Sequence, residues 1–368
     1  MRNLKILQIC KYGLSEKGGI EQVTSDYHKI FSDNYHKCIS LAFLKRKGNY
    51  KQIKGEKGFN SSFSFLGQPI SLKYFSYLFR KSGHFDILYL HYPNPIALIL
   101  TAILKRKKQR LIVHWHSDII KPFPISLISE IVEKICLPYV DKIVCTSDLY
   151  SSSSKSLRNV SKKISIIPIG TEKTSFETKT KLSTRGNLNL IFIGRLVEYK
   201  GLNFLIETLE KLDFVNLKII GDGPLRNQLE AKIQFYQLSD RIEIKEGVED
   251  DLKLELLHQA DFLILPSISR SEAFGVVLLE SISTATPILT SNVFGSGMNF
   301  INDQQIDEKC GYTFNSENQE SLEELLIFLK ELDDHTYENL SHNSKKRHEN
   351  FFSSSVVTSK IQSFIHDY

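Results

Sequence analysis

Two glutamates, Glu272 and Glu280, stand eight positions apart just after an apolar run at Phe262–Leu265. We expect that run to be a strand and the helix after it to open with Glu272 in its first turn. At 3.6 residues per turn, this spacing projects both carboxylates from similar faces, about 12 Å apart. The helix start would offer an anion, or a cluster of hydroxyls, the free backbone N–H groups of Ala273, Phe274, Gly275 and Val276. Glu280 would reach the far end of an extended ligand, such as a ribose diol.

Two cations, Arg195 and Lys200, lie in the segment Gly194–Gly201, between an expected strand and an expected helix. Arginine binds two phosphate oxygens at once with its planar guanidinium group, whereas lysine acts as a point charge. Fixed cations of this kind stabilise the negative charge that develops on a departing phosphate group. The pair therefore indicates a phosphate-binding loop.

A glycine pair, Gly18 and Gly19, follows the first expected strand and precedes a helical pattern. Glycines let a backbone approach a phosphate closely, and the helix start after them supplies N–H groups. A plain structural turn is the alternative interpretation.

Histidines His114 and His116 end another expected strand, and alternation places both on one face of it. Two histidines at this spacing fit zinc, but the sequence reveals no third ligand beside them. Ordinary core or surface histidines are the other interpretation. The carboxyl ends of parallel strands are where α/β proteins bind ligands, so this strand end is a candidate site.

Both halves of the chain alternate short β-branched runs with helical patterns, which predicts an α/β fold with parallel sheets. A polar segment, residues 171–187, is interpreted as the linker between them. We expect one domain at residues 1–170, a second at 171–350, and a terminal helix at 351–368. The expected strands are Leu4–Cys10, Ile39–Phe43, Ile87–Leu90, Leu111–His116, Lys142–Cys145, Ile164–Ile167, Leu190–Ile193, Leu217–Ile220, Ile242–Lys245, Phe262–Leu265 and Ile288–Thr290.

Charge divides the chain unevenly. Residues 1–168 carry 27 Lys and Arg against 11 Asp and Glu, a net charge of +16, and the remainder carries 20 against 31, a net charge of −11. The basic runs at Lys45–Lys47 and Lys105–Arg110 belong to the positive half, which predicts an anionic partner. An anionic membrane surface fits, while nucleic acid lacks any supporting motif.

The five cysteines are scattered, and the first residues lead straight into a strand, so we expect a reduced, cytoplasmic protein without a signal peptide.

These motifs, in this order along nearly the whole chain, resemble the retaining glycosyltransferases of family 4, which have the GT-B fold. The resemblance rests on the Gly-Gly loop, the histidine strand end, Gly-Arg-x5-Lys-Gly, Gly-Asp-Gly-Pro at 221–224, and Glu-x7-Glu. It implies two Rossmann-like domains facing a cleft, with the acceptor in the first and a nucleotide sugar in the second. It also implies a tail that crosses back to the first domain.

The resemblance assigns roles to the candidate residues. Glu272 and the nearby amides would hold the donor sugar, Glu280 the ribose, and Arg195 with Lys200 the diphosphate. His116 would meet the reacting sugar, His91 and Asp118 would line the acceptor side, and Gly247 with Val248 would contact the base through their backbone. No Asp-x-Asp occurs, so no metal and no cofactor is expected.

A lipid-linked saccharide acceptor at the cytoplasmic face fits the charge pattern, and bacterial O-antigen or other surface-polysaccharide assembly would be the pathway. The loop Phe294–Asn299 departs from the commonest family pattern, which leaves mannose, rhamnose, galactose and N-acetylhexosamines open as donor sugars. Two alternatives remain at this point. A nicotinamide-dependent oxidoreductase would need G-x-G-x-x-G after the first strand, and a non-catalytic basic membrane binder would leave the Arg, Lys and Glu motifs unexplained. Because no apolar anchor is evident, neutral vesicles should bind little.

Overall fold

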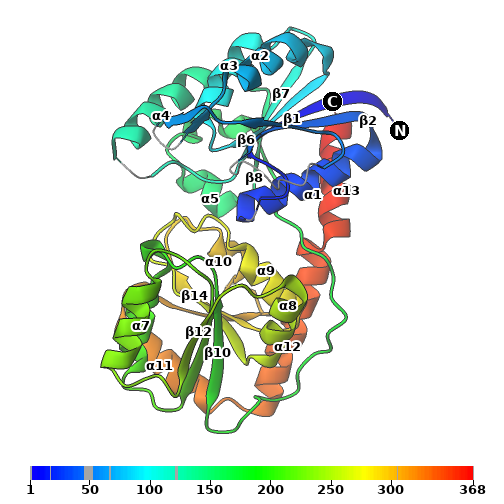
Figure 1. Cartoon of the computed structure of the whole chain (residues 1–368). Coiled ribbons are helices and arrows are strands. Elements are labelled where there is room, and N and C mark those ends of the chain that lie inside the picture. The colour runs from blue at the N-terminus through cyan, green and yellow to red at the C-terminus, as the bar shows by residue number, and fades with distance from the viewer. Residues whose placement is uncertain are drawn as a thin grey trace. The chain divides into compact units, whose positions relative to one another are not determined.

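The computed structural model describes residues 2–16, 18–44, 53–65, 68–120, 123–304 and 306–367. The chain divides into two compact units, Met1–Ile167 and Pro168–Tyr368, where the sequence predicted a boundary after residue 170. Each unit contains its own parallel sheet with helices packed on it (Figure 1). The basic run at 45–47 lies outside the described residues.

The first unit is built on a seven-stranded parallel sheet in the order β3-β2-β1-β6-β7-β8-β9, with a separate β4-β5 ribbon. Its strands are β1 (Arg2–Tyr12), β2 (Tyr35–Leu44), β3 (Glu56–Asn60), β4 (Phe63–Phe65), β5 (Gln68–Ile70), β6 (Ile87–Tyr92), β7 (Arg110–Trp115), β8 (Lys142–Cys145) and β9 (Ile164–Ile166). Its helices are α1 (Gly19–Asn34), α2 (Leu72–Lys81), η1 (Ser82–His84), α3 (Pro95–Leu104), α4 (Phe123–Cys136), η2 (Leu137–Tyr139), α5 (Asp148–Ser153) and η3 (Arg158–Lys163).

The second unit has a six-stranded parallel sheet in the order β12-β11-β10-β13-β14-β15, the strand order of a Rossmann sheet. Its strands are β10 (Leu188–Ile193), β11 (Val215–Ile220), β12 (Ile242–Lys245), β13 (Phe262–Leu265), β14 (Ile288–Asn292) and β15 (Gly311–Asn315). Its helices are η4 (Glu198–Lys200), α6 (Leu202–Leu209), α7 (Arg226–Phe235), α8 (Asp250–Gln259), α9 (Val276–Ser283), α10 (Met298–Ile301), α11 (Gln319–Lys330), α12 (Asp334–Arg347), η5 (His348–Phe352) and α13 (Ser354–His366). Helices α7 and α11 cover one face of this sheet and α8, α9 and α12 the other (Figure 1).

Every strand expected from the sequence is present, and the fold class is confirmed. The central strands are apolar runs buried on both faces, as in β6 and β13, which is why their sequences are easily recognised. The sequence analysis missed β3 and β15. Each is an edge strand, β3 of the first unit's sheet and β15 of the second unit's sheet. Both are short and half polar, so they have no apolar run to mark them.

The polar segment interpreted as a linker is fastened to the second unit. The backbone N–H of Lys179 donates to Ser341 Oγ at 2.8 Å, and that of Ser183 donates to Asp261 Oδ1 at 2.7 Å. Of the terminal helix expected at 351–368, the structure forms α13 at Ser354–His366, and Ser353 just before it pairs with Thr171. The course of this tail toward the first domain stays a prediction.

Helix α4 carries exposed aliphatic side chains that the sequence analysis did not identify. Four aliphatic side chains, Leu127, Ile128, Ile131 and Ile135, are 50%, 51%, 54% and 62% exposed, respectively. Their spacing places them on one stripe of the helix, because positions one, four and eight residues apart fall within about 100° of rotation. None of the described helices is long and apolar enough to cross a membrane.

Candidate active site

The site in the second unit lies where its strand order reverses. Strands β10 and β13 are neighbours in the sheet, and the chain leaves them in opposite directions across it. In open α/β sheets, ligands bind outside the carboxyl ends of strands at this switch point. The two loops that follow these strands touch, since the N–H of Ile268 donates to the carbonyl of Tyr199 at 2.8 Å. Residues far apart in sequence are thereby brought to one place.

Gly201 makes this close approach possible. Its φ is +72°, and a Cβ placed on it would lie 2.0 Å from the carbonyl oxygen of Pro266. A side chain here would therefore be strained by its own backbone angle and would also push the two loops apart.

Lys200 and Glu272 form a buried ion pair across these loops. The two residues are only 7% and 8% exposed, and Ser267 Oγ donates to the same carboxylate oxygen at 3.2 Å. Burial alone disfavours the charge of Lys200, but the adjacent carboxylate outweighs it and raises the pKa of the lysine. The result is a fixed cation and a fixed anion, both preorganised at the sheet edge.

Glu272 does not begin a helix, so that prediction is wrong. Helix α9 starts at Val276, after Gly275 in the left-handed region at φ +81°, and Glu272 lies in the loop before it. The loop is held from the other side, where Ser296 Oγ donates to the Glu272 carbonyl at 2.6 Å and Gly297 N–H donates to the Ala273 carbonyl at 2.8 Å. The helical pattern in the sequence could not reveal this, because contacts from residues 296–297 fix the loop.

Glu280 belongs to a second ion pair. Its carboxylate accepts from Lys253 of helix α8 at 2.9 Å, and Lys253 also meets Asp250 at 3.0 Å. Burial opposes the charge of Lys253, but the Glu280 carboxylate raises the pKa of this lysine. The structure thus gives the two glutamates separate partners, and the sequence analysis did not identify Lys253.

Arg195 is exposed on the loop after β10. That loop is fastened to the one after β11, because the N–H of Leu196 donates to the Asp222 carbonyl at 2.9 Å and the N–H of Gly194 to the Ile220 carbonyl at 3.0 Å. Gly247, in the loop after β12, is also exposed, with Val248 half-buried beside it.

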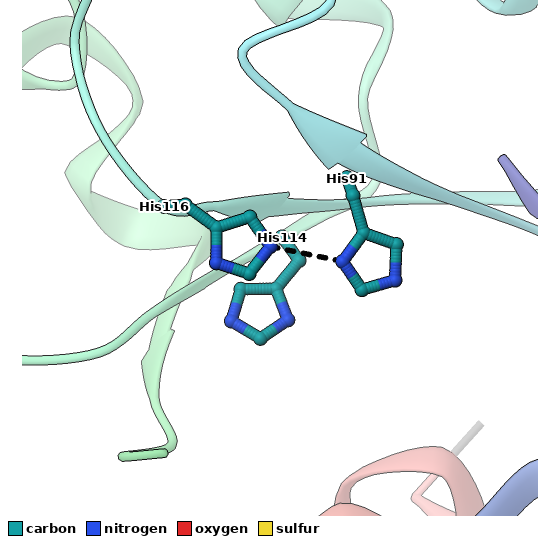
Figure 2. A group of neighbouring side chains, drawn as sticks. All are labelled: His91, His114 and His116. Carbon is teal, nitrogen blue, oxygen red and sulfur yellow. Dashed lines mark hydrogen bonds between the residues drawn. The ribbon is translucent and has the colours of Figure 1, made fainter. Parts of the chain in front are cut away.

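In the first unit, three histidines gather at the ends of β6 and β7. His91 and His114 are paired across the two strands, and His116 follows two residues further along the same face. All three are buried, and Figure 2 shows their rings side by side, with His91 Nδ1 and His116 Nε2 2.9 Å apart. Burial lowers the pKa of His91 and His114 well below the usual range and that of His116 to about 3, so the rings are neutral.

His91, on the neighbouring strand β6, is the third histidine that sequence spacing could not place beside His114 and His116. The three side chains lie close enough together to be considered as ligands of one metal ion. Their orientation does not suit one. The rings of His114 and His116 are stacked at 4.1 Å with planes 19° apart, and those of His91 and His116 are only 9° apart. Because ring-nitrogen lone pairs lie in the ring plane, such parallel rings do not aim at one ion about 2.1 Å away.

Asp118 is engaged by the protein itself. Its Oδ1 accepts from Trp115 Nε1 and from Ser154 Oγ, each at 2.8 Å, and its N–H donates to Tyr150 at 2.7 Å. These contacts give the carboxylate a structural role, and its place beside an acceptor stays a prediction. Gly18 and Gly19 lie at the start of α1.

Two adjoining family models match most of the chain: "Glycosyltransferase Family 4" over residues 17–174 and "Glycosyl transferases group 1" over 175–347. The chain belongs to glycosyltransferase family 4. The oxidoreductase and non-catalytic alternatives therefore fall away, and this enzyme is a glycosyltransferase.

Known relatives and a solved structure agree with this assignment. The transferase is 28% identical over 79% of its length to O-antigen chain mannosyltransferase C of Escherichia coli, covering 77% of that protein. It is 30% identical over 63% of its length to D-rhamnosyltransferase WbpZ of Pseudomonas aeruginosa, covering 61% of that protein. The structure of Anabaena Alr3699/HepE in complex with UDP and glucose matches with a TM-score of 0.76, 17% identity and complete coverage of both chains. The GT-B fold of this glycosyltransferase is thereby confirmed.

Sequence reasoning missed several residues that shape the transferase's site. Ser267 and Ser296 hold Glu272, Lys253 holds Glu280, and Gln8 bonds to His91. No motif marks them, because serine, lysine and glutamine at these positions act only through partners distant in sequence.

Proposed function

We propose that this enzyme transfers a hexose from a nucleoside-diphosphate sugar to a saccharide acceptor, with retention of configuration and without a metal ion. The observation that carries the proposal is the buried Lys200–Glu272 pair at the switch point of the second unit. A buried cation beside a buried anion suits a ligand that is itself divided into an anionic diphosphate and a neutral, hydroxyl-rich sugar.

In this proposal, Lys200 and Arg195 stabilise the negative charge that develops on the departing diphosphate. Glu272 accepts hydrogen bonds from the sugar hydroxyls, helped by the amides of residues 273–276. Glu280, oriented by Lys253, accepts from the ribose diol. In the first unit, His116 contacts the reacting sugar, and His91 stands on the acceptor side.

The donor sugar is proposed from the relatives. One is named as a mannosyltransferase and another as a D-rhamnosyltransferase, and D-rhamnose is mannose without its 6-hydroxyl. Both sugars share the axial 2-hydroxyl. We therefore propose a manno-configured donor and, from the O-antigen relative, an acceptor linked to polyprenyl diphosphate in bacterial surface-polysaccharide assembly.

The test is incubation of the enzyme with a panel of GDP- and UDP-sugars and a polyprenyl-diphosphate saccharide, followed by product mass and the anomeric configuration from NMR. A product formed only from manno-configured donors, with the anomeric configuration of the donor, is expected. An inverted product would overturn retention, and turnover of UDP-glucose alone would overturn the donor assignment.

We also propose that the enzyme attaches to anionic membrane surfaces through α4. Its exposed aliphatic stripe is joined to the basic loop after α3, since α3 packs against α4 and Lys105 Nζ donates to the Tyr139 carbonyl at 3.3 Å. Lys107 and Lys108 in that loop are exposed. Apolar side chains bordered by cations fit the interface of an anionic bilayer, as amphipathic surface helices do.

A further inference from the structure

A buried hydrogen-bond chain leads from the core of the first unit to His116. It begins at Gln8 in β1, which is fully buried. Gln8 Nε2 donates to the Thr24 carbonyl at 2.8 Å, and Gln8 Oε1 accepts from Ser40 Oγ at 2.7 Å. A carbonyl can only accept, so the orientation of the Gln8 amide is fixed.

The fixed amide decides the state of His91. Gln8 Nε2 has a second hydrogen, and its remaining partner is His91 Nε2 at 2.9 Å. His91 Nε2 must therefore accept, and the single proton of the neutral ring is on Nδ1. That Nδ1–H donates to His116 Nε2, 2.9 Å away.

The same reasoning applies to His116. Because His116 Nε2 accepts from His91, the proton of the neutral His116 ring is on Nδ1. Figure 2 shows that this second ring nitrogen lies on the side of the ring away from His91. Burial lowers the pKa of His91 and His116 and keeps the two rings neutral, so protonation does not interconvert their tautomers.

We propose that Gln8 and His91 are positioning residues that lock His116 in the Nδ1–H tautomer, so that it presents a hydrogen-bond donor to a substrate oxygen. The identity of that oxygen as one of the reacting sugar rests on the proposed function. The tautomer itself does not. Neither Gln8 nor its coupling to His91 is marked by any motif in the sequence.

One consequence distinguishes this role from acid–base catalysis. His116 Nδ1 already carries a proton, and Nε2 is occupied by the His91 proton. His116 therefore cannot accept a proton from an acceptor hydroxyl without breaking the chain, and its titration should leave no limb in the pH profile of kcat/KM above about pH 4.

The first experiment reads the tautomers directly. Protein labelled with ¹⁵N-histidine gives separate signals for protonated and unprotonated ring nitrogens, and with 11 histidines the His91 and His116 signals can be assigned from single substitutions. Wild-type protein without substrate should show protonated Nδ1 and bare Nε2 at His116. Gln8→Glu, nearly the same shape, places an acceptor opposite His91 Nε2 and gives up the hydrogen bond to the Thr24 carbonyl. It should reverse the chain and move the His116 proton to Nε2.

The matched control is Gln109→Glu, the same chemical change at a buried glutamine of the same unit. Gln109 Nε2 donates to the carbonyls of Ser82 and Phe85, each at 2.7 Å, and has no place in the chain to His116. It should cost stability but leave the His116 signals unchanged. His91→Phe, which removes the donor but keeps an aromatic ring, should give mixed tautomers at His116.

The second experiment measures turnover. Gln8→Glu should lower kcat about 100-fold, the usual effect of losing one oriented donor, with little change in the donor KM. Reversed tautomers with unchanged kcat would refute the catalytic role of the donor while leaving the chain intact. A wild-type His116 protonated on Nε2, or unaltered in Gln8→Glu, would overturn the inference whatever the activity. So would a stoichiometric, chelatable metal ion at the three histidines, because ligating nitrogens cannot carry these protons.

Discussion

At the scale of residues, the Lys200–Glu272 pair shows how stability and function are separated. Burying two charges costs desolvation energy that their mutual attraction only partly returns, so apolar replacements of such pairs often fold at least as well. Removing one partner is different, since it leaves an uncompensated buried charge. The pair is therefore best explained by what it does for a bound ligand, and this can be tested by substituting one or both residues.

Lys200→Met should destabilise the second unit by about 3 kcal/mol, whereas Lys200→Met with Glu272→Leu should recover most of that loss. Both variants should lose about 100-fold or more in kcat, because the cation proposed to stabilise the leaving group is gone. Urea denaturation followed by circular dichroism gives the stability, and product formation gives the rate. Recovery of activity in the double variant would contradict the proposed role of the pair.

Arg195→Ala should also slow turnover about 100-fold, yet it should barely change stability, because the side chain is exposed. Steady-state kinetics with saturating donor measures the effect. The control is Arg241→Ala. Arg241 lies just before β12 and donates to the carbonyls of Leu212 and Val215, just before and at the start of β11, so its loss should lower stability and spare kcat. A normal rate in Arg195→Ala would remove this residue from the leaving-group role.

The three neutral histidines make the first unit sensitive to acid. Their pKa values are lowered on folding, so between about pH 6.5 and the lowered values the unfolded chain binds more protons than the folded one. Stability therefore falls as pH falls from 7 to 5, by up to about 1.4 kcal/mol per pH unit for each histidine. Trp115, the only tryptophan, is buried in this unit, and its fluorescence reports the unfolding transition.

His114→Phe should make this pH dependence less steep. His114 Nε2 is buried without a hydrogen-bond partner among the described residues, and Nδ1 meets the Tyr89 hydroxyl at 3.3 Å, so an apolar ring there should cost little more than that one hydrogen bond. The matched variant His342→Phe changes an exposed histidine of α12 and should leave the slope for the first unit unaltered. An unchanged slope in His114→Phe would show that this ring does not titrate as inferred.

At the scale of elements, α4 presents a solvent face that its sequence alone did not reveal. The alternation of aliphatic and polar residues predicts a helix, but which face packs inward depends on α3, which lies against it. The packed structure leaves the stripe at Leu127, Ile128, Ile131 and Ile135 exposed. Exposed apolar area of this kind usually marks a binding surface.

Replacing Ile128 and Ile131 by glutamine should weaken binding to anionic vesicles by about tenfold or more without changing the net charge, because full burial of one aliphatic side chain contributes about 1.5–3 kcal/mol and about 1.4 kcal/mol is a factor of ten. Ile327→Gln, at a comparably exposed site on α11 of the second unit, is the control. Cosedimentation measures both. Equal binding by all three proteins would show that α4 does not contact lipid.

At the scale of the whole molecule, the two units carry opposite charge, and the positive one contains α4. Net charge of +16 in residues 1–168 favours anionic lipid at long range, while the aliphatic stripe acts only on contact. Raising salt to 1 M shortens the Debye length to about 3 Å, so vesicle binding should drop sharply. The wild-type protein should keep a weak residual binding that the glutamine variant lacks. Complete loss at high salt in both proteins would leave only the electrostatic component.

The enzyme as a whole should work without a divalent ion, because the proposed diphosphate partners are side-chain cations. Turnover should be unchanged in excess EDTA and unchanged again on adding Mg²⁺ or Mn²⁺. Loss of activity that Mg²⁺ restores would reassign the diphosphate to a metal ion.

The sequence alone determined the fold class, the family and the order of the motifs. Buried parallel strands such as β6 and β13 must be continuous apolar runs, and phosphate-binding loops need glycine and cations at fixed spacing, so both leave local signatures. Family membership follows from those signatures because they occur in the right order.

Only the tertiary structure decided which of these residues meet. Sequence spacing placed Glu272 in a helix with Glu280, but packing from residues 296–297 holds it in a loop against Lys200, and Lys253 from another helix takes Glu280. Strand pairing likewise brought His91 beside His114 and Gln8 within reach of His91. Contacts of this kind depend on sheet order and loop closure over tens of residues. A periodic pattern in one segment therefore cannot specify them.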